Sequence, residues 1–261
     1  MTTRLGLLLL LIAAAGFRLA AQQSVPTFEV ASVRRNLSET PPAMTVPSQG
    51  TVAITNVPLI NIIVNAYATP PFRIVGVPEW VSRDRFDITA RPPDGAPANP
   101  LPMLRTLLEE RFKLRVHRES REQPAYALLL ARTDGRLGPG LKTSATDCTT
   151  AIVPSGDSRC ARGVMGVGPA GGVIVTNGQP LSRMISALSM AVNRSIVDRT
   201  GLDGPFDAEL RWSSDVNTSP ANSDTPSIFT ALQEQLGLRL ESTRAPVEVL
   251  VIDSVERPTP D

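Results

Sequence analysis

The stretch TVAITNVPLINIIVNAY, residues 51–67, begins with alternating apolar and polar residues and continues with apolar residues at helical spacing. Alternation with a period of two is typical of a strand, and a spacing of three and four residues is typical of a helix. The stretch GVIVTNGQPLSRMISALSMAV, residues 172–192, repeats this order, and Pro58 and Pro180 both lie near the expected helix start, where a missing N–H costs least. The repetition of a strand and a helix in each half of the chain indicates an internal duplication.

The segments that follow these two stretches also correspond in order. Each half continues with two strand-like segments, a loop, a helix and two further strands. In the first half they lie at 72–81, 85–91, 92–102, 103–112, 113–120 and 125–132. In the second half they lie at 194–204, 205–212, 213–227, 228–237, 238–243 and 247–255. We expect Pro124 and Pro246 to lie in turns between the last two strands, and Gly237 to end the last helix.

This order of elements predicts an α+β protein with two related β-α-β-β-α-β-β units. The helices are expected to pack on one face of small mixed or antiparallel sheets. The first unit is expected at residues 22–135, where the segment 28–35 adds a further strand, and the second unit at residues 171–261. Residues 136–170 are expected to be a linker with a disulfide loop, because they are rich in Gly, Pro, Ser and Asp.

Residues 1–21, MTTRLGLLLLLIAAAGFRLAA, have the features of a signal peptide. Arg4 gives a positive start, Leu5 to Ala15 form an apolar run, and Leu19-Ala20-Ala21 form a cleavage site before Gln22. The alternative is an uncleaved membrane anchor, but the uncharged run is shorter than the ~20 residues that a spanning helix needs. We therefore expect an exported protein, periplasmic or extracellular, with no stable membrane anchor after cleavage.

Export gives a meaning to the two cysteines. Cys148 and Cys160 flank a stretch rich in turn-forming residues, and in an oxidising compartment such a pair is expected to form a disulfide. The alternative is a metal or redox pair, but the spacing is much wider than in Cys-x-x-Cys and no histidine lies near. No metal and no cofactor is expected.

The composition excludes some classes of function. Of 261 residues 42% are hydrophobic, which is enough for a substantial core, and 26 basic against 25 acidic residues leave a formal charge of +1. No basic excess therefore points to nucleic acid. His117 is the only histidine, and it is expected on the solvated side of a strand. No motif of the common hydrolases is present.

The remaining candidates have simple structural interpretations. Asp198 and Thr200, followed by Gly201, Leu202 and Gly204, are expected to form tight turns in which Asp198 accepts backbone N–H groups. A calcium site is the alternative, but the spacing differs from that of a calcium loop. Trp80 and Trp212 are expected in the core, with ligand binding as the alternative. Asp84 is expected to be a turn residue, and the run GVMGVGPAGG at 163–172 a flexible linker.

Several long segments resemble a known family. VDRTGLDGPFDAELRW (197–212), ALQEQLGLRLESTRAPVEVLVIDSVERP (231–258), FEVASVRRN (28–36) and LLEERFKLRVHRESREQPAYALLLAR (107–132) are similar to a soil-associated, acidobacterial-type family of exported bacterial proteins of unknown function. This resemblance covers nearly the whole mature chain and implies no catalytic residue. PLSRMISAL (180–188) with FTALQEQLGLRLE (229–241) also resembles the short N-terminal domain of secretins and TonB-dependent receptors, which implies contacts with periplasmic partners.

These features favour an exported, non-enzymatic interaction module whose exposed strand edges accept a strand from an envelope protein or peptide. One alternative is a hydrolase that acts on a cell-wall or extracellular polymer through paired carboxylates. Another is a protein that binds a small molecule in the crevice between the two units. The sequence does not specify the oligomeric state.

Overall fold

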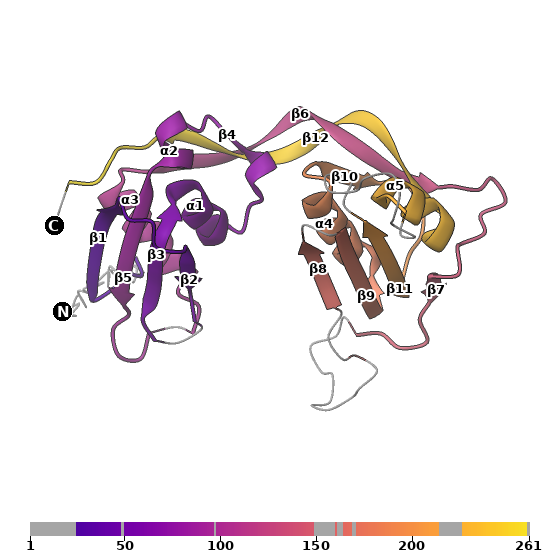
Figure 1. Cartoon of the computed structure of the whole chain (residues 1–261), viewed down its shortest axis with the longest axis horizontal. Helices are drawn as coiled ribbons and strands as arrows, with labels where there is room; N and C mark the ends of the chain where they lie inside the picture. Colours follow the sequence, from indigo (N-terminus) through magenta and orange to yellow (C-terminus); the bar gives the residue numbers. More distant parts are fainter. Residues whose placement is uncertain are drawn as a thin grey trace, which may run out of the picture.

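The computed structural model describes residues 25–47, 50–96, 98–148, 160, 164–168, 171–213 and 226–259. The expected signal peptide lies outside these residues. The described chain has a mixed α+β fold with two lobes, which are joined by a ribbon of two long antiparallel strands, β6 (Arg115–Leu130) and β12 (Leu238–Ser254) (Figure 1).

The first lobe contains one antiparallel sheet, in the order β1-β5-β3-β2, and two longer helices. Its elements are β1 (Val30–Asn36), β2 (Ala43–Thr45), β3 (Val52–Pro58), α1 (Leu59–Tyr67), the 3-10 turn η1 (Pro71–Arg73), β4 (Ile74–Val75), α2 (Glu79–Arg83), β5 (Arg85–Arg91) and α3 (Leu101–Arg111).

The second lobe has a corresponding antiparallel sheet in the order β7-β11-β9-β8. Its elements are β7 (Leu141–Thr143), β8 (Val164–Gly168), β9 (Gly171–Pro180), α4 (Leu181–Ala191), β10 (Ser195–Asp198), β11 (Pro205–Ser213), α5 (Ile228–Ala231) and the π-helical turn η3 (Leu232–Leu236). As predicted, Gly237 ends this last helix, in the left-handed conformation with φ of 69°.

The ribbon exchanges strands between the lobes. The first half of β6 pairs with the second half of β12, so that Arg118 lies opposite Leu250, and the second half of β6 pairs with the first half of β12, so that Leu128 lies opposite Leu240. The outer strands β4 and β10 then pair in parallel with β12 and β6, which gives a mixed sheet in the order β10-β6-β12-β4. Neither half of the chain closes its own last two strands into a hairpin.

The predicted turns at Pro124 and Pro246 are therefore wrong. Pro124 lies opposite Arg244 and Pro246 lies opposite Glu122, all within continuous strands. A proline lacks the N–H of a ladder bond and is tolerated where a strand has no second neighbour. Among the described residues, β10 begins its pairing with β6 only at Ala125, so the outer side of β6 is open at Pro124.

The exchange also crosses the expected unit boundaries. The first core contains Leu250 and Ile252 of β12, which are 1% and 6% exposed. The second core contains Leu128 of β6, which is fully buried. Each lobe is thus completed by a strand from the other half of the chain. The expectation that residues 22–135 and 171–261 each form a continuous unit is corrected accordingly.

The stretch 136–170 also differs from its expectation as a linker, because it contributes β7 and β8 to the sheet of the second lobe. These strands have three and five residues. Short strands rich in glycine lack the alternation from which a strand is predicted. The described residues of the predicted linker at 163–172 therefore belong to the paired strands β8 and β9.

Local conformations repeat between the lobes and support the duplication. Asn56 and Gly178 have φ of 53° and 58° at irregularities in β3 and β9. Their backbone N–H groups donate to the carboxylates of Asp87 and Asp207, at 2.8 and 2.9 Å. Ala68, directly after α1, and Asn193, two residues after α4, are also left-handed, with φ of 48° and 49°. In the second lobe α4 contacts β9 of the lobe sheet and β10, the outer strand of the mixed sheet.

Candidate functional site

The predicted turn after β10 is held by its own side chains. Asp198 Oδ1 accepts bonds from the backbone N–H of Thr200 at 2.9 Å and from its hydroxyl at 2.7 Å. Thr200 Oγ1 accepts the N–H of Leu202 at 3.1 Å, and Gly201 and Gly204 have φ of 71° and 95°. These bonds occupy the polar groups locally, so this signature turn stabilises the loop between β10 and β11.

His117 lies on the outer face of the ribbon, as predicted for a solvated strand position, and its side chain is 48% exposed. Its Nδ1 is 2.9 Å from both carboxylate oxygens of Asp253, and its Nε2 is 3.5 Å from Glu119. The hydrogen bond with Asp253 raises the pKa of His117, and Glu119 acts in the same direction. The histidine is therefore biased towards its charged form, which has no lone pair to act as a base.

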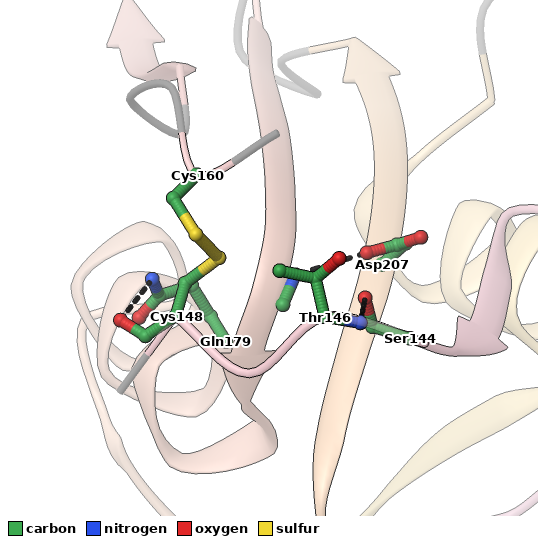
Figure 2. Close-up of a disulfide and its surroundings, with 7 residues drawn as sticks. Ser144, Thr146, Cys148, Cys160, Gln179 and Asp207 are labelled. Atoms are coloured by element: carbon green, nitrogen blue, oxygen red, sulfur yellow. Dashed lines mark hydrogen bonds between the residues drawn. A yellow bond between two sulfur atoms is a disulfide. The ribbon is translucent and has the colours of Figure 1, made fainter. Parts of the chain in front are cut away.

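The disulfide between Cys148 and Cys160 fastens a loop to the second sheet, and it confirms the predicted pairing (Figure 2). The backbone N–H of Cys148 donates to the carbonyl of Gly178 at 2.8 Å, and the Gln179 amide donates to the carbonyl of Cys148. A Cβ on Gly178 would lie 2.6 Å from the Cys148 sulfur. Only glycine permits this approach, so the disulfide and the irregularity in β9 form one packed unit.

A buried carboxylate in the first lobe holds two arginines from distant segments. Asp84 follows α2 and its side chain is 9% exposed. Its Oδ1 accepts a bond from Arg35 of β1 at 2.9 Å, and its Oδ2 accepts a bond from Arg257 of the C-terminal segment at 2.8 Å. The hydrogen bond from Arg257 is the main cause that lowers the pKa of Asp84, and Arg35 contributes further. We call Asp84, Arg35 and Arg257 the arginine clasp.

Trp80 and Trp212 differ in their surroundings. Trp212 is 6% exposed in the second core, as expected for a packing residue. Trp80 packs against the first core while the guanidinium of Arg257 lies 4.8 Å from its ring centre. Trp80 therefore connects the first core to the arginine clasp by a cation–π contact.

The arginine clasp borders a surface cavity of about 340 Å³. Its lining includes Arg34, Arg35 and Arg257 together with the apolar side chains of Phe86 and Pro258. This site has no signature in the sequence, since Arg35, Asp84 and Arg257 come from three separate parts of the chain and form no motif. Only Asp84 had a sequence signal, and it was that of a turn.

β8 is an outer strand of the sheet in the second lobe. Its register with β9 runs from Val164 opposite Val175 to Gly168 opposite Gly171, across a two-residue connection. Among the residues that the structure describes, β8 has no second strand neighbour. Its sequence VMGVG contains neither charge nor proline, which are the usual means of preventing pairing at an open edge.

The other outer strands of the two lobe sheets carry such protection. Pro41 and Pro42 precede β2, Arg34 and Arg35 lie in β1, and β7 has only three residues, one of which is Lys142. β8 is thus the outer strand of these sheets that is best suited to receive another strand.

No group of three or more His, Cys, Asp or Glu side chains in the described part of the chain is placed to hold a metal ion. No helix within the described ranges is long and apolar enough to cross a membrane.

The fold defines a two-lobed α+β protein whose internal repeats exchange strands. The chain belongs to the family described as Protein of unknown function (DUF3738), whose model matches residues 60–255. The match runs from α1 to the end of the ribbon, so it includes the second lobe and the part of the first lobe that follows β3. No curated protein and no solved structure matches the chain.

Proposed function

We propose that the protein is an exported, non-enzymatic interaction module of the bacterial cell envelope, and that it binds an extended segment of a partner protein along β8. The observation that carries the proposal is the open edge of β8. In this mode of recognition the main-chain hydrogen bonds of the added strand supply affinity. The disulfide between Cys148 and Cys160 is compatible with an oxidising compartment outside the cytoplasm.

The register of the hairpin identifies the groups that would bind the partner. Because two residues connect Gly168 and Gly171, this closing pair forms the narrow, hydrogen-bonded pair of the hairpin. Hydrogen-bonded pairs then alternate along the ladder, so Gly166 and Val164 also bond to β9. The N–H and C=O groups of Met165 and Val167 consequently point away from β9, towards an incoming strand.

We expect Val167→Pro to abolish partner binding while the fold is retained. Proline removes an N–H that makes no bond to β9, and it is tolerated on an edge strand whose N–H faces solvent. The measurement is recovery of cross-linked partners from a bacterial envelope fraction, with the contact sites mapped by mass spectrometry. For the wild-type protein the contact sites should map to β8.

Val167→Ala is the matched control, because it also shortens the side chain but retains the N–H. Binding should persist in the alanine variant and fall at least about tenfold in the proline variant, as expected when several main-chain bonds are lost together. Equal recovery by both variants, or contact sites that map elsewhere, would contradict docking on β8.

A further inference from the structure

We propose that the cavity beside the arginine clasp binds a small organic anion, in which a carboxylate or phosphate head is joined to a compact apolar body. This site is distinct from the edge of β8, because it lies in the first lobe and shares no residue with the second lobe. It also places a ligand within one lobe rather than in the crevice between the two.

The charge of the cavity favours an anion. Among the residues that the structure describes, three arginines and no acidic residue line it. The nearest carboxylate of the clasp, Asp84, lies behind Arg35 and Arg257 and is committed to them through both of its oxygens. Arg34 alternates with Arg35 along β1 and lies directly opposite Asp87. The guanidinium groups of Arg35 and Arg257 against the single carboxylate of Asp84 therefore leave an excess of one positive charge at the cavity.

The arginine clasp also holds its guanidinium groups in position before a ligand arrives. Asp84 holds Arg35 and Arg257 by ion pairs, and the guanidinium of Arg257 also lies over the ring of Trp80. A guanidinium has five N–H donors. In the described structure Arg257 uses its Nε for Asp84, and Arg35 uses one terminal nitrogen, so donors remain for a ligand. Groups that are already ordered lose little conformational entropy on binding.

The size and the walls of the cavity define the rest of the ligand. A volume of about 340 Å³ lies at the lower end of the range for small-molecule sites. Pro258, which is partly exposed, supplies apolar surface beside the charged groups, and Phe86 of the first core lies next to it with 1% of its surface exposed. A ligand with a single anionic head and a small ring or branched chain satisfies both parts of this lining.

Four probes test the proposal on the full chain. Benzoate and phenyl phosphate combine an anionic head with a ring, benzyl alcohol keeps the ring without the charge, and inorganic phosphate keeps the charge without the ring. Trp80 is the reporter in a Trp212→Phe background, since Arg257 contacts its ring. At least one of the two organic anions should change the Trp80 fluorescence saturably, with a Kd below about 10 mM. The anion that binds more tightly identifies the preferred head group, carboxylate or phosphate.

Arg257→Gln and Arg35→Gln should each weaken binding of that anion at least about tenfold when it is measured by calorimetry, because a charge-assisted bond to the head is lost. Arg91→Gln is the control, since Arg91 forms an exposed ion pair with Glu29 outside this cavity. Retained affinity in Arg91→Gln together with weakened binding in both cavity variants supports the site.

Several results would overturn it. These are no saturable binding of either organic anion, unchanged affinity in both cavity variants, benzyl alcohol binding as tightly as benzoate, or inorganic phosphate binding as tightly as phenyl phosphate. Because Val167→Pro leaves this cavity untouched, failure here and failure of docking on β8 are separate outcomes.

Discussion

Leu250→Ala is expected to destabilise the first lobe, although Leu250 lies near the C-terminus. Leu128→Ala is expected to destabilise the second lobe, although Leu128 lies in the first half of the chain. Each leucine is at least 99% buried in the core of the lobe that its strand completes. Truncation of a buried leucine removes apolar contacts and leaves a cavity, so each change should cost about 2–5 kcal/mol of unfolding free energy.

The two tryptophans make this crossed effect measurable, because Trp80 packs against the first core and Trp212 lies in the second. In variants that retain one tryptophan, Leu250→Ala should shift the denaturant midpoint reported by Trp80 more than that reported by Trp212, and Leu128→Ala should do the reverse. Native-state hydrogen exchange resolves the lobes even if they unfold together. Loss of protection in α4 rather than α1 after Leu250→Ala would contradict strand exchange.

Asp84→Asn is expected to lower the stability of the first lobe by about 2 kcal/mol at pH 7. It removes two charge-assisted hydrogen bonds from a buried acceptor, but both arginines are more than half exposed, so the loss is smaller than for a fully buried pair. Unfolding monitored by Trp80 fluorescence measures the effect. Asp94→Asn, which changes an exposed loop residue, is the control and should have little effect.

The difference in unfolding free energy between the wild type and Asp84→Asn is expected to decrease in acid. The pKa of Asp84 is lowered in the folded state, mainly by the hydrogen bond from Arg257. The stabilisation is therefore fully present above the unfolded-state pKa of about 3.9, and it is lost as the pH falls below that value through the folded-state pKa. The gap between wild type and Asp84→Asn should be constant from pH 7 to 5 and narrow towards pH 3. A gap that widens in acid would show that Asp84 is not held ionised by the arginines.

Much of the order of elements was predictable because those elements have a strong local pattern. The strand expected at 72–81 is wrong, because this stretch holds η1, the two-residue β4 and the start of α2, whose N-cap is Pro78. The strand-helix pairs at 51–67 and 172–192, the stop at Gly237 and the turn at Asp198 all depend on residues close together in the sequence. The disulfide was predictable for a different reason, because only two cysteines exist in the chain.

The exchange of strands was not predictable, since a hairpin within each half and a crossed pairing bury the same residues. The segments 113–120 and 125–132 have the same alternation in either arrangement, and Pro124 suits a turn as well as an open strand edge. The arginine clasp was hidden because Arg35 and Arg257 are far apart in the sequence and meet only when both ends of the chain reach Asp84. Long-range contacts of this kind leave no periodic signal.

A cross-strand cysteine pair tests strand exchange most directly. Ser120 and Glu248 are exposed and lie directly opposite each other in the ribbon, so Ser120→Cys with Glu248→Cys should form a disulfide within one chain on mild oxidation. In a local hairpin Ser120 would instead face Ala125, which in the continuous strand lies about 16 Å away. We therefore predict that peptide mapping finds the bond between 120 and 248, beside the native Cys148–Cys160 bond. A bond that forms readily between cysteines at 120 and 125, with none between 120 and 248, would contradict the exchanged fold.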